Sequence, residues 1–225
     1  PLFQPPTRPV EGETRGTIMR PPPGGTAGWA GGAVDPDTGM LYIPSRNQVS
    51  VIGLYAPDAT SGSTMAYTHG APEAQRMEQL RQGIRTGPQM PQGLPLFKPP
   101  YSRITAIDLN TGDHAWMNPL GNGDRIRNHP MLRALDLPPL GGDGSRSGPL
   151  VTKTLLIYAL TTGGSNGGPR LLAVDKASGA EIASVDLPRG AIGTPMTYLL
   201  NGVQYISLTI GGSPVPELIA LALPD

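Results

Sequence analysis

The stretch ITAIDLNTGDHAW at residues 104–116 decides the fold, because residues 171–183, LLAVDKASGAEIA, repeat its pattern. In both stretches the order is Ala, an apolar residue, Asp, two variable residues, Thr or Ser, and then Gly. The first stretch ends in Trp116, and the second has Ala183 at the matching position. Two short apolar stretches joined by an Asp-x-x-x-Gly turn are typical of a β-hairpin. A hairpin that recurs indicates a repeated unit, and this repeat predicts the blades of a β-propeller.

The composition is typical of a turn-rich all-β protein, because the 31 Gly and 27 Pro residues among 225 disfavour long helices. The balanced charge, with 17 basic and 17 acidic residues, predicts no surface for nucleic acid or an anionic membrane. The chain has no Cys, which excludes disulfides and thiolate metal sites within it. It also lacks the run of about 18 apolar residues that a membrane-spanning helix needs.

The other predicted strands adjoin short turns rich in Gly, Pro, Asn or Asp. Those turns are expected at residues 35–39, 152–153 and 201–202, with strands at 33–34, 41–43 and 217–224 among others. Residues 48–55 are predicted to be the third strand, after the hairpin formed by 33–34 and 41–43. Asn201-Gly202 is a strong signal for a short hairpin. The predicted strands make up about three blades, of which the last is incomplete. The predicted fold is therefore all-β and corresponds to a partial β-propeller.

Three stretches without a strand pattern are predicted to be irregular: an extended segment at residues 1–27 and loop insertions at 56–100 and 118–148. Within the first insertion, apolar residues at helical spacing in 73–85 allow a short helix. A closed propeller needs at least about four blades. Residues 1–225 are therefore expected to be the C-terminal portion of a larger propeller, or half of one supplied by two chains. The start at Pro1, in place of Met, supports that expectation.

Four segments match a known family in register: RGTIMRPPPGGTAGWAGGAVDPDTGMLYIPS (15–45), SGPLVTKTLLIYALTT (147–162), the stretch 171–212 with its TPMTY, NGVQY and GG elements, and ELIALALPD (217–225). In these residues the chain resembles the C-terminal part of the PQQ-dependent quinoprotein dehydrogenases, in particular the membrane-bound glucose dehydrogenase branch. The resemblance implies an eight-bladed propeller that binds pyrroloquinoline quinone (PQQ) near its axis. A divalent cation, Ca²⁺ or Mg²⁺, would be held mostly by residues outside this chain.

The resemblance also implies an activity and partners. Such an enzyme oxidises a sugar, polyol or alcohol by hydride transfer to the quinone, while an Asp base takes the hydroxyl proton. Electrons then pass to ubiquinone or a cytochrome acceptor. The family's base lies upstream of the part represented here, so the catalytic residue is unknown and this part alone is expected to be inactive. The remaining propeller blades are expected partners, and the location is the periplasmic face, with a membrane anchor in a missing N-terminal segment.

Two loops match the family's cofactor contacts. In the first, Gly28 stands where the family has Asn or Glu, and Trp29 follows it. In the second, Gly193, Thr194 and Pro195 match a loop near the central channel. Backbone amides or the Thr194 hydroxyl are expected to contact the quinone carboxylates. No metal ligand is assigned within the chain.

Other conspicuous residues have structural interpretations. Trp116 is predicted to dock between adjacent blades, because burying so large a ring is strongly favourable. Trp29 is open to either a core or a site role. The repeated Asp residues are interpreted as turn formers whose carboxylates bond backbone amides; they are Asp35, Asp108 and Asp175.

The His residues and the Gly-rich loop at 163–168 carry little signal for a site. His69, His114 and His129 are too far apart for a metal-ligand spacing, and His129 is the best isolated candidate for a base. The Gly-rich loop lacks the Lys and the helix of a phosphate-binding loop and is predicted to be a hairpin loop.

Two alternatives to an enzyme remain open. One is a propeller scaffold that has lost the cofactor site, which Gly28 and Ala183 favour. The other is a binding domain that folds alone, which open sheet edges disfavour because unpaired edges promote association.

Overall fold

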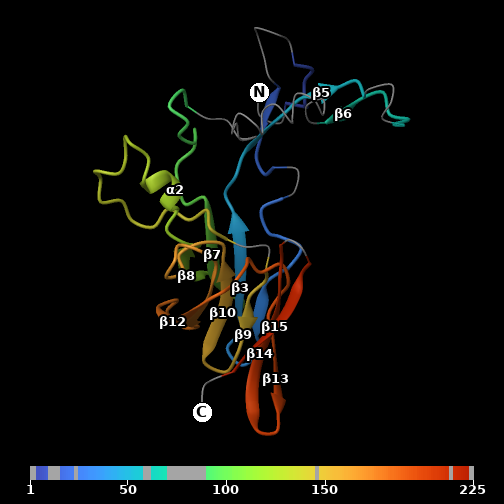
Figure 1. The fold of residues 1–225 in the computed structure, drawn as a ribbon. Coiled ribbons are helices and arrows are strands. Elements are labelled where there is room, and N and C mark those ends of the chain that lie inside the picture. Colours follow the sequence, from blue (N-terminus) through green and yellow to red (C-terminus); the bar gives the residue numbers. More distant parts are fainter. Residues whose placement is uncertain are drawn as a thin grey trace. The chain divides into compact units, whose positions relative to one another are not determined.

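The computed structural model describes residues 4–9, 16–22, 25–57, 62–69, 90–144, 147–212 and 215–222. The chain divides into two compact units, one of Pro1–Gly25 with Gln48–Lys98 and one of Thr26–Asn47 with Pro99–Asp225. Strands are the main regular elements of the larger unit (Figure 1), the smaller unit has four short strands, and α2 (Asp124–Arg127) is a single helical turn. The structure thus confirms the predicted all-β class.

The larger unit starts with a four-stranded antiparallel sheet in the order β2, β3, β7, β8. Its strands are β2 (Ala33–Asp35), β3 (Met40–Arg46), β7 (Ser102–Asp108) and β8 (His114–Pro119). β3 and β7 pair over their whole lengths, from Met40 opposite Asp108 to Arg46 opposite Ser102. The hairpin predicted from the ITAIDLNTGDHAW stretch is the β7–β8 hairpin.

The third strand of this first sheet differs from the sequence prediction. Residues 48–55 are predicted to supply it, whereas the structure places β7 there, after the insertion. β4 (Ser50–Ile52) and β5 (Leu54–Tyr55) do form, but they pair with strands of the smaller unit. The physical reason is the length of the pairing. β7 has seven residues and pairs with all seven residues of β3, whereas β4 has only three and would leave most of β3 without a partner strand.

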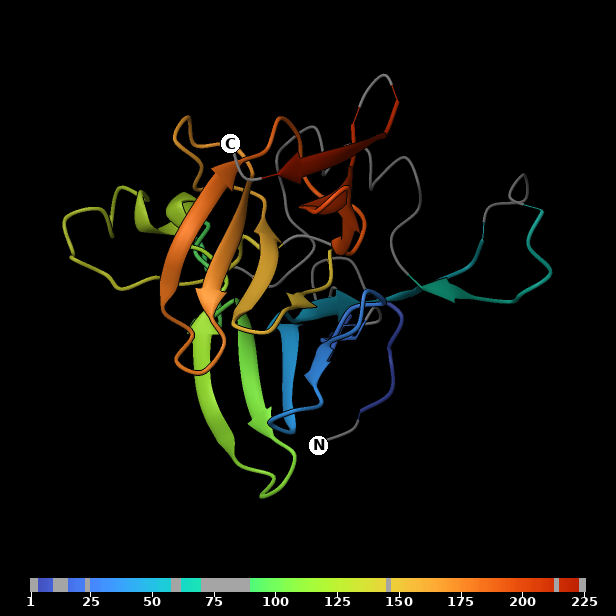
Figure 2. The same cartoon turned by 90° about the horizontal axis from the view of Figure 1, so that it is seen from below.

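Two further sheets complete the larger unit. The second has the order β12, β11, β10, β9 and the third the order β13, β14, β15. Their strands are β9 (Leu150–Val151), β10 (Leu155–Leu160), β11 (Arg170–Asp175), β12 (Glu181–Asp186), β13 (Met196–Leu200), β14 (Val203–Ile210) and β15 (Glu217–Ala222). In Figure 2 the first sheet is blue to green, the second yellow to orange, and the third red. The described residues thus form two four-stranded sheets and one three-stranded sheet, as the repeat pattern predicts.

The smaller unit contains two short pairs of strands. β1 (Thr17–Met19) pairs with β4, and β5 pairs with β6 (Thr68–His69), both antiparallel. The guanidinium of Arg8 lies 5.7 Å from the ring centre of Tyr67, within the range of a cation–π contact. The helix predicted within residues 73–85 lies outside the described residues.

Two apolar cores join the three sheets. The core between the first and second sheets contains Tyr42, Ile104, Ala106, Leu156, Tyr158, Leu160, Leu172 and Val174. The core between the second and third contains Ile157, Ala159, Leu171, Leu208 and Ile210. Alternate residues of β10 therefore face opposite cores, because successive side chains of a strand point to opposite faces. The sheets consequently stack face to face, as propeller blades do.

The larger unit has two distinct ends. At one, which we call the loop end, the segments that lead into β2, β9 and β13 meet, and the long stretches between strands leave and return. At the other, the turn end, the strands are joined by short turns at residues 36–39, 109–113, 152–154, 176–180 and 201–202. A site built from irregular backbone therefore belongs at the loop end.

Among the described residues, no helix is long and apolar enough to cross a membrane.

Candidate functional site

Gly148 joins the two loops that, by the family resemblance, are expected to contact a cofactor. Its backbone N–H donates to Thr194 Oγ1 over 3.3 Å. A Cβ at Gly148 would lie 2.5 Å from the carbonyl oxygen of Ala30 and 2.8 Å from Thr194 Oγ1, so only Gly allows this approach. The structure therefore brings the Gly28-Trp29 loop and the Gly193-Thr194-Pro195 loop to the same residue, at the loop end of the larger unit.

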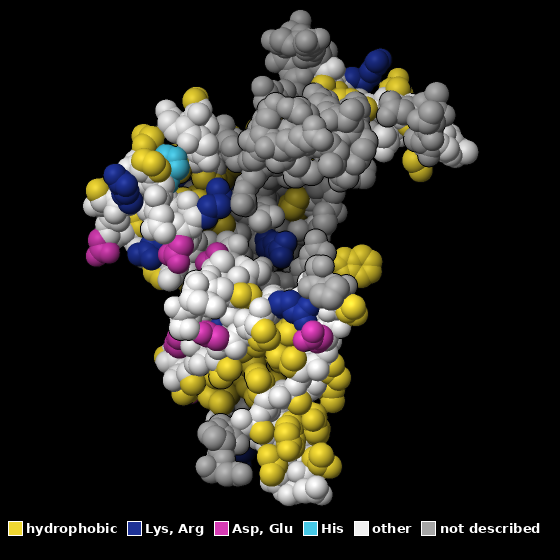
Figure 3. Space-filling view, in the orientation of Figure 1, with side chains coloured by type: hydrophobic (Ala, Val, Ile, Leu, Met, Phe, Trp, Pro, Cys, Tyr) yellow, Lys and Arg dark blue, Asp and Glu magenta, His cyan; other side chains and the backbone are white. Residues whose placement is uncertain are grey.

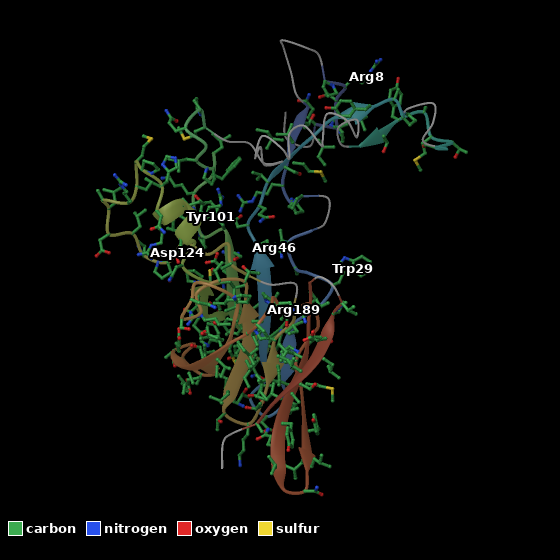
Figure 4. All side chains as sticks on the ribbon, in the orientation of Figure 1. Arg8, Trp29, Arg46, Tyr101, Asp124 and Arg189 are labelled. Atoms are coloured by element: carbon green, nitrogen blue, oxygen red, sulfur yellow. The ribbon has the colours of Figure 1, made fainter. Side chains whose placement is uncertain are left out.

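The first loop presents an exposed aromatic ring. A backbone hydrogen bond from Gly31 N to Gly28 O over 3.1 Å closes a tight turn, and Gly31 has a φ of 70° that favours glycine. Trp29 sits in this turn with its side chain fully exposed. Figure 4 shows it pointing away from the strands. Trp29 thus contributes nothing to the cores of this chain, and its ring is available to a ligand.

The second loop is tied to the third sheet. Ala191 pairs with Ile210, and Ile192 N donates to Thr209 O over 2.9 Å. Pro195 is buried, whereas Thr194 is exposed and accepts the Gly148 hydrogen bond through its hydroxyl oxygen. Because a hydroxyl can accept and donate at once, the proton of Thr194 stays available as a donor.

Sequence reasoning missed Gly148 as the joint between these loops. It has no side chain that a motif could reveal, and only its position before the first strand of a sheet connects it to the Gly28 loop. The segment SGP (147–149), which precedes β9 as the Trp29 loop precedes β2, is the signal that a closer comparison of the repeats offers.

Trp116 docks the first sheet on the second, as predicted. Its indole Nε1 donates to the carbonyl oxygen of Lys176 over 3.2 Å, and Tyr42 Oη donates to the same oxygen over 3.0 Å. The ring lies over the turn of the second repeat, where a Cβ at Gly179 would come within 2.9 Å of Trp116 Cε3. Trp116 is therefore a structural residue and lies away from the loop end.

Asp35 has a turn role and a second role that the sequence analysis did not foresee. Its carboxylate accepts hydrogen bonds from Asp37 N and Thr38 Oγ1, as expected of a turn former. It also accepts from the ammonium of Lys176, which lies 2.5 Å away on the second sheet's turn. The hydrogen bond from Lys176, with that from Thr38, holds the pKa of Asp35 below its ordinary value. A carboxylate held ionised in this way is poorly suited to act as a base.

The other two repeated Asp residues are confirmed as turn formers. Asp108 Oδ1 accepts from Asn110 N over 2.8 Å, and Asp175 Oδ1 accepts from Ser178 N over 2.8 Å. The side-chain and backbone hydrogen bonds from Ser178 hold the pKa of Asp175 below its ordinary value. Both lie at the turn end, so neither reaches the candidate loops.

The His residues and the Gly-rich loop add no chemistry to the site. His129 Nδ1 accepts from Met131 N over 3.2 Å within the loop that follows α2. Across the described ranges, no group of His, Asp and Glu could hold a metal ion. The loop at 163–168 is closed by a hydrogen bond from Gly164 N to Gly168 O, and Asp186 accepts from Ser165, so it is the hairpin loop predicted.

A family model described as PQQ, the glucose/ethanol/alcohol dehydrogenase β-propeller domain, matches residues 1–206. Among curated relatives, the glycerol dehydrogenase large subunit of Gluconobacter thailandicus is 30% identical over 224 residues. That match covers 89% of this chain and 29% of that protein. Quinoprotein glucose dehydrogenase A of Acinetobacter calcoaceticus is 27% identical, over 93% of this chain and 26% of that protein.

The fold has counterparts among solved structures. The quinohemoprotein alcohol dehydrogenase of Comamonas testosteroni aligns with a TM-score of 0.54 and 20% sequence identity, covering 87% of this chain and 24% of that one. The three sheets thus match a portion of a larger propeller. The chain spans less than a third of the length of each relative named here.

Proposed function

The chain belongs to the PQQ family of glucose/ethanol/alcohol dehydrogenase β-propeller domains, and we propose that it forms part of an enzyme that oxidises a sugar, polyol or alcohol with PQQ. The observation that carries the proposal is the family match over residues 1–206, which includes the first two sheets and both candidate loops. The curated relatives, which are named for glycerol and for glucose, support a polyol or sugar as substrate.

PQQ, when bound, accepts hydride from the carbon that bears the substrate hydroxyl. We place the catalytic base outside this chain, because the Asp residues of the repeats are committed to turns at the other end of the sheets. The proposed acceptor of the electrons is ubiquinone or a cytochrome.

The residues at the loop end fit the edge of a planar, anionic cofactor. Trp29 offers an exposed ring that can stack on a planar group. Thr194 offers a hydroxyl proton to an oxygen, and the tight backbone contacts around Gly148 hold both loops in place. We therefore keep Gly28, Trp29, Gly193, Thr194 and Pro195 as the proposed cofactor-contacting residues, with Gly28 contributing backbone groups only. The divalent cation would be held by residues outside this chain.

We further propose that residues 1–225 are the C-terminal portion of the propeller and that the remaining blades complete the ring. The outward face of the third sheet supports this view, because it exposes an apolar surface (Figure 3) of Met196, Tyr198, Leu200, Val203 and Leu218. Burying such a face against another sheet is strongly favourable. A position on the periplasmic face, with an anchor in another segment, is part of the same proposal.

A scaffold that has lost the cofactor site is the second candidate. Gly28 favours it, because a Gly there supplies no polar side chain to a ligand. Ala183 also favours it, since the second repeat lacks the docking Trp of the first.

The test uses the full-length protein with PQQ and Ca²⁺ or Mg²⁺. We expect saturable PQQ binding, measured by calorimetry, and reduction of an artificial dye with at least one aldose, polyol or alcohol. Binding without turnover on any substrate would favour a dehydrogenase with a substrate outside the panel. Absence of PQQ binding would contradict the enzyme proposal and leave the scaffold.

A further inference from the structure

Arg46 ends β3 at the loop end, between the first and second sheets. Its backbone N–H donates to Thr26 O over 2.8 Å, which fixes it beside the Gly28 loop. It shares a strand face with Tyr42, which packs in the core against the second sheet. Its Nη2 lies 3.5 Å from the carbonyl oxygen of Gly144, which in turn bridges to Leu160 of β10. The guanidinium, labelled in Figure 4, therefore lies above the junction of the two sheets.

Arg46 has no carboxylate partner among the described residues, although it is half-buried. Four other half-buried cations of the larger unit are paired: Arg127 with Asp124, Arg170 with Glu181, Lys176 with Asp35, and Arg189 with Glu217. Within the described part of the chain Arg103 is unpaired like Arg46, but it lies on the opposite face of the first sheet, against Met117 Sδ. Acidic residues at the loop end are engaged elsewhere: Asp143 accepts from Gly123 N, Asp186 from Ser165, and Glu217 pairs with Arg189. Among the described residues, therefore, no carboxylate lies within ion-pair distance of the Arg46 guanidinium.

A half-buried guanidinium in this state favours an anionic ligand. It has five N–H donors, and the structure gives it one long hydrogen bond to a carbonyl oxygen. A charge removed from water without a partner is costly, and a planar carboxylate satisfies two donors at once in parallel hydrogen bonds. Arg suits this task better than Lys because its donors are fixed in a plane.

We propose that Arg46 binds a carboxylate group at the loop end, above the junction of the first and second sheets. The inference rests on the proposed function, which offers two sources of that group: a carboxylate of PQQ, or the carboxylate of a substrate that is a hydroxy acid. Ala30 and Gly148, which lead into the first strands of these same two sheets, place the candidate cofactor loops at the same end.

Arg103 provides a matched control. It lies on β7 opposite Ser45, one residue out of register with Arg46, so its side chain leaves the opposite face of the sheet. It is also half-buried, has no carboxylate partner among the described residues, and its Nη1 lies 3.3 Å from Met117 Sδ. Replacing Arg103 by Gln removes the same charge from the same sheet without touching the junction.

The experiment compares the wild type, Arg46→Gln, Arg46→Lys and Arg103→Gln as full-length proteins, after thermal unfolding has shown that each is folded. Calorimetry measures binding of PQQ with Ca²⁺, of gluconate, which carries one carboxylate, and of glucose, which carries none. We expect Arg46→Gln to weaken a carboxylate ligand by about tenfold or more, with Arg46→Lys intermediate and Arg103→Gln unchanged.

The ligand that responds identifies the source of the carboxylate. Loss of PQQ affinity assigns the cofactor, and loss of gluconate affinity with glucose unchanged assigns an acidic substrate. Equal affinities of Arg46→Gln and Arg103→Gln for both anions would overturn the inference. A wild type that binds no PQQ contradicts the proposed function, and the gluconate titration then tests the Arg46 inference by itself. If the wild type binds no gluconate, or if Arg46→Gln binds gluconate as well as the wild type does, the Arg46 inference is overturned.

Discussion

The ammonium of Lys176 lies 2.5 Å from Oδ2 of Asp35, so the turn of the second sheet is bound to the first hairpin of the first sheet. The backbone of Lys176 strengthens the same joint, because its carbonyl oxygen accepts from both Tyr42 and Trp116. One turn residue thus connects two sheets through its charge and its backbone. Both side chains of the ion pair are largely shielded from water.

This joint predicts acid sensitivity. The pKa of Asp35 is below its ordinary value, first because of the hydrogen bond from Lys176 and then because of that from Thr38. A carboxyl whose pKa is lowered by folding stabilises the fold fully above its unfolded-state pKa of about 4, and this contribution is lost as the pH falls through its folded-state value. Lys176→Met removes the main cause of the lowered pKa. We expect the free energy of unfolding to fall less steeply below pH 4 in this variant than in the wild type, and parallel curves would contradict the assignment.

Gly179 and Gly112 occupy the same position in the two repeats and should respond differently to Ala. Both have positive φ, 73° and 83° respectively, so each substitution costs about 1 kcal/mol of backbone strain. A Cβ at Gly179 would also press on Trp116 and Asn118, whereas a Cβ at Gly112 would meet nothing within 4 Å. We expect Gly179→Ala to lower the free energy of unfolding by about 2 kcal/mol more than Gly112→Ala, measured by urea denaturation. Equal losses would show that the Trp116 ring moves aside freely.

Gly148→Ala should disturb the candidate site rather than the cores. The new methyl group would lie against Ala30 O and Thr194 Oγ1 and force the two loops apart. We expect the affinity of the full-length protein for PQQ to fall by about tenfold. Gly190→Ala is the control, because a Cβ there meets nothing within 4 Å and the residue lies just before the same loop. Similar PQQ affinities for the two variants would remove Gly148 from the site.

Trp29→Ala separates binding from stability. Because the side chain is fully exposed, its removal should change the free energy of unfolding by less than about 0.5 kcal/mol. If the ring stacks on PQQ, the affinity should fall by about threefold to tenfold, and Trp29→Phe should recover part of it. Unchanged PQQ affinity in Trp29→Ala would exclude the ring from the cofactor site.

The sequence predicts the hairpins well because their turns are local. Asn201-Gly202 determines a two-residue turn whichever sheet it joins, and the structure gives both residues the positive φ that this turn requires. The docking of Trp116 is also predictable, since a large ring at the end of a repeated hairpin pattern needs a partner surface. In these cases the physical cause lies within a few residues.

The partners of distant strands are less predictable. Residues 48–55 have strand character, and only the full pairing of β3 with β7 shows that they belong to another unit. In the same way, nothing beside Arg46 in the sequence shows that it lies near Gly144, because that contact depends on the stacking of two sheets. Gly148 was missed for a related reason, since its role comes from the backbone atoms it allows to approach.

The placement of the insertion between β3 and β7 bears on how the protein folds. β10, β11 and β12 are joined by short loops, so their sheet closes with little loss of chain entropy, whereas β3 and β7 must first bring residues 46 and 102 together. The second sheet should therefore form early and serve as the template on which the first is completed. Replacing residues 48–98 with a short turn should accelerate folding of the larger unit, while its unfolding rate stays nearly the same.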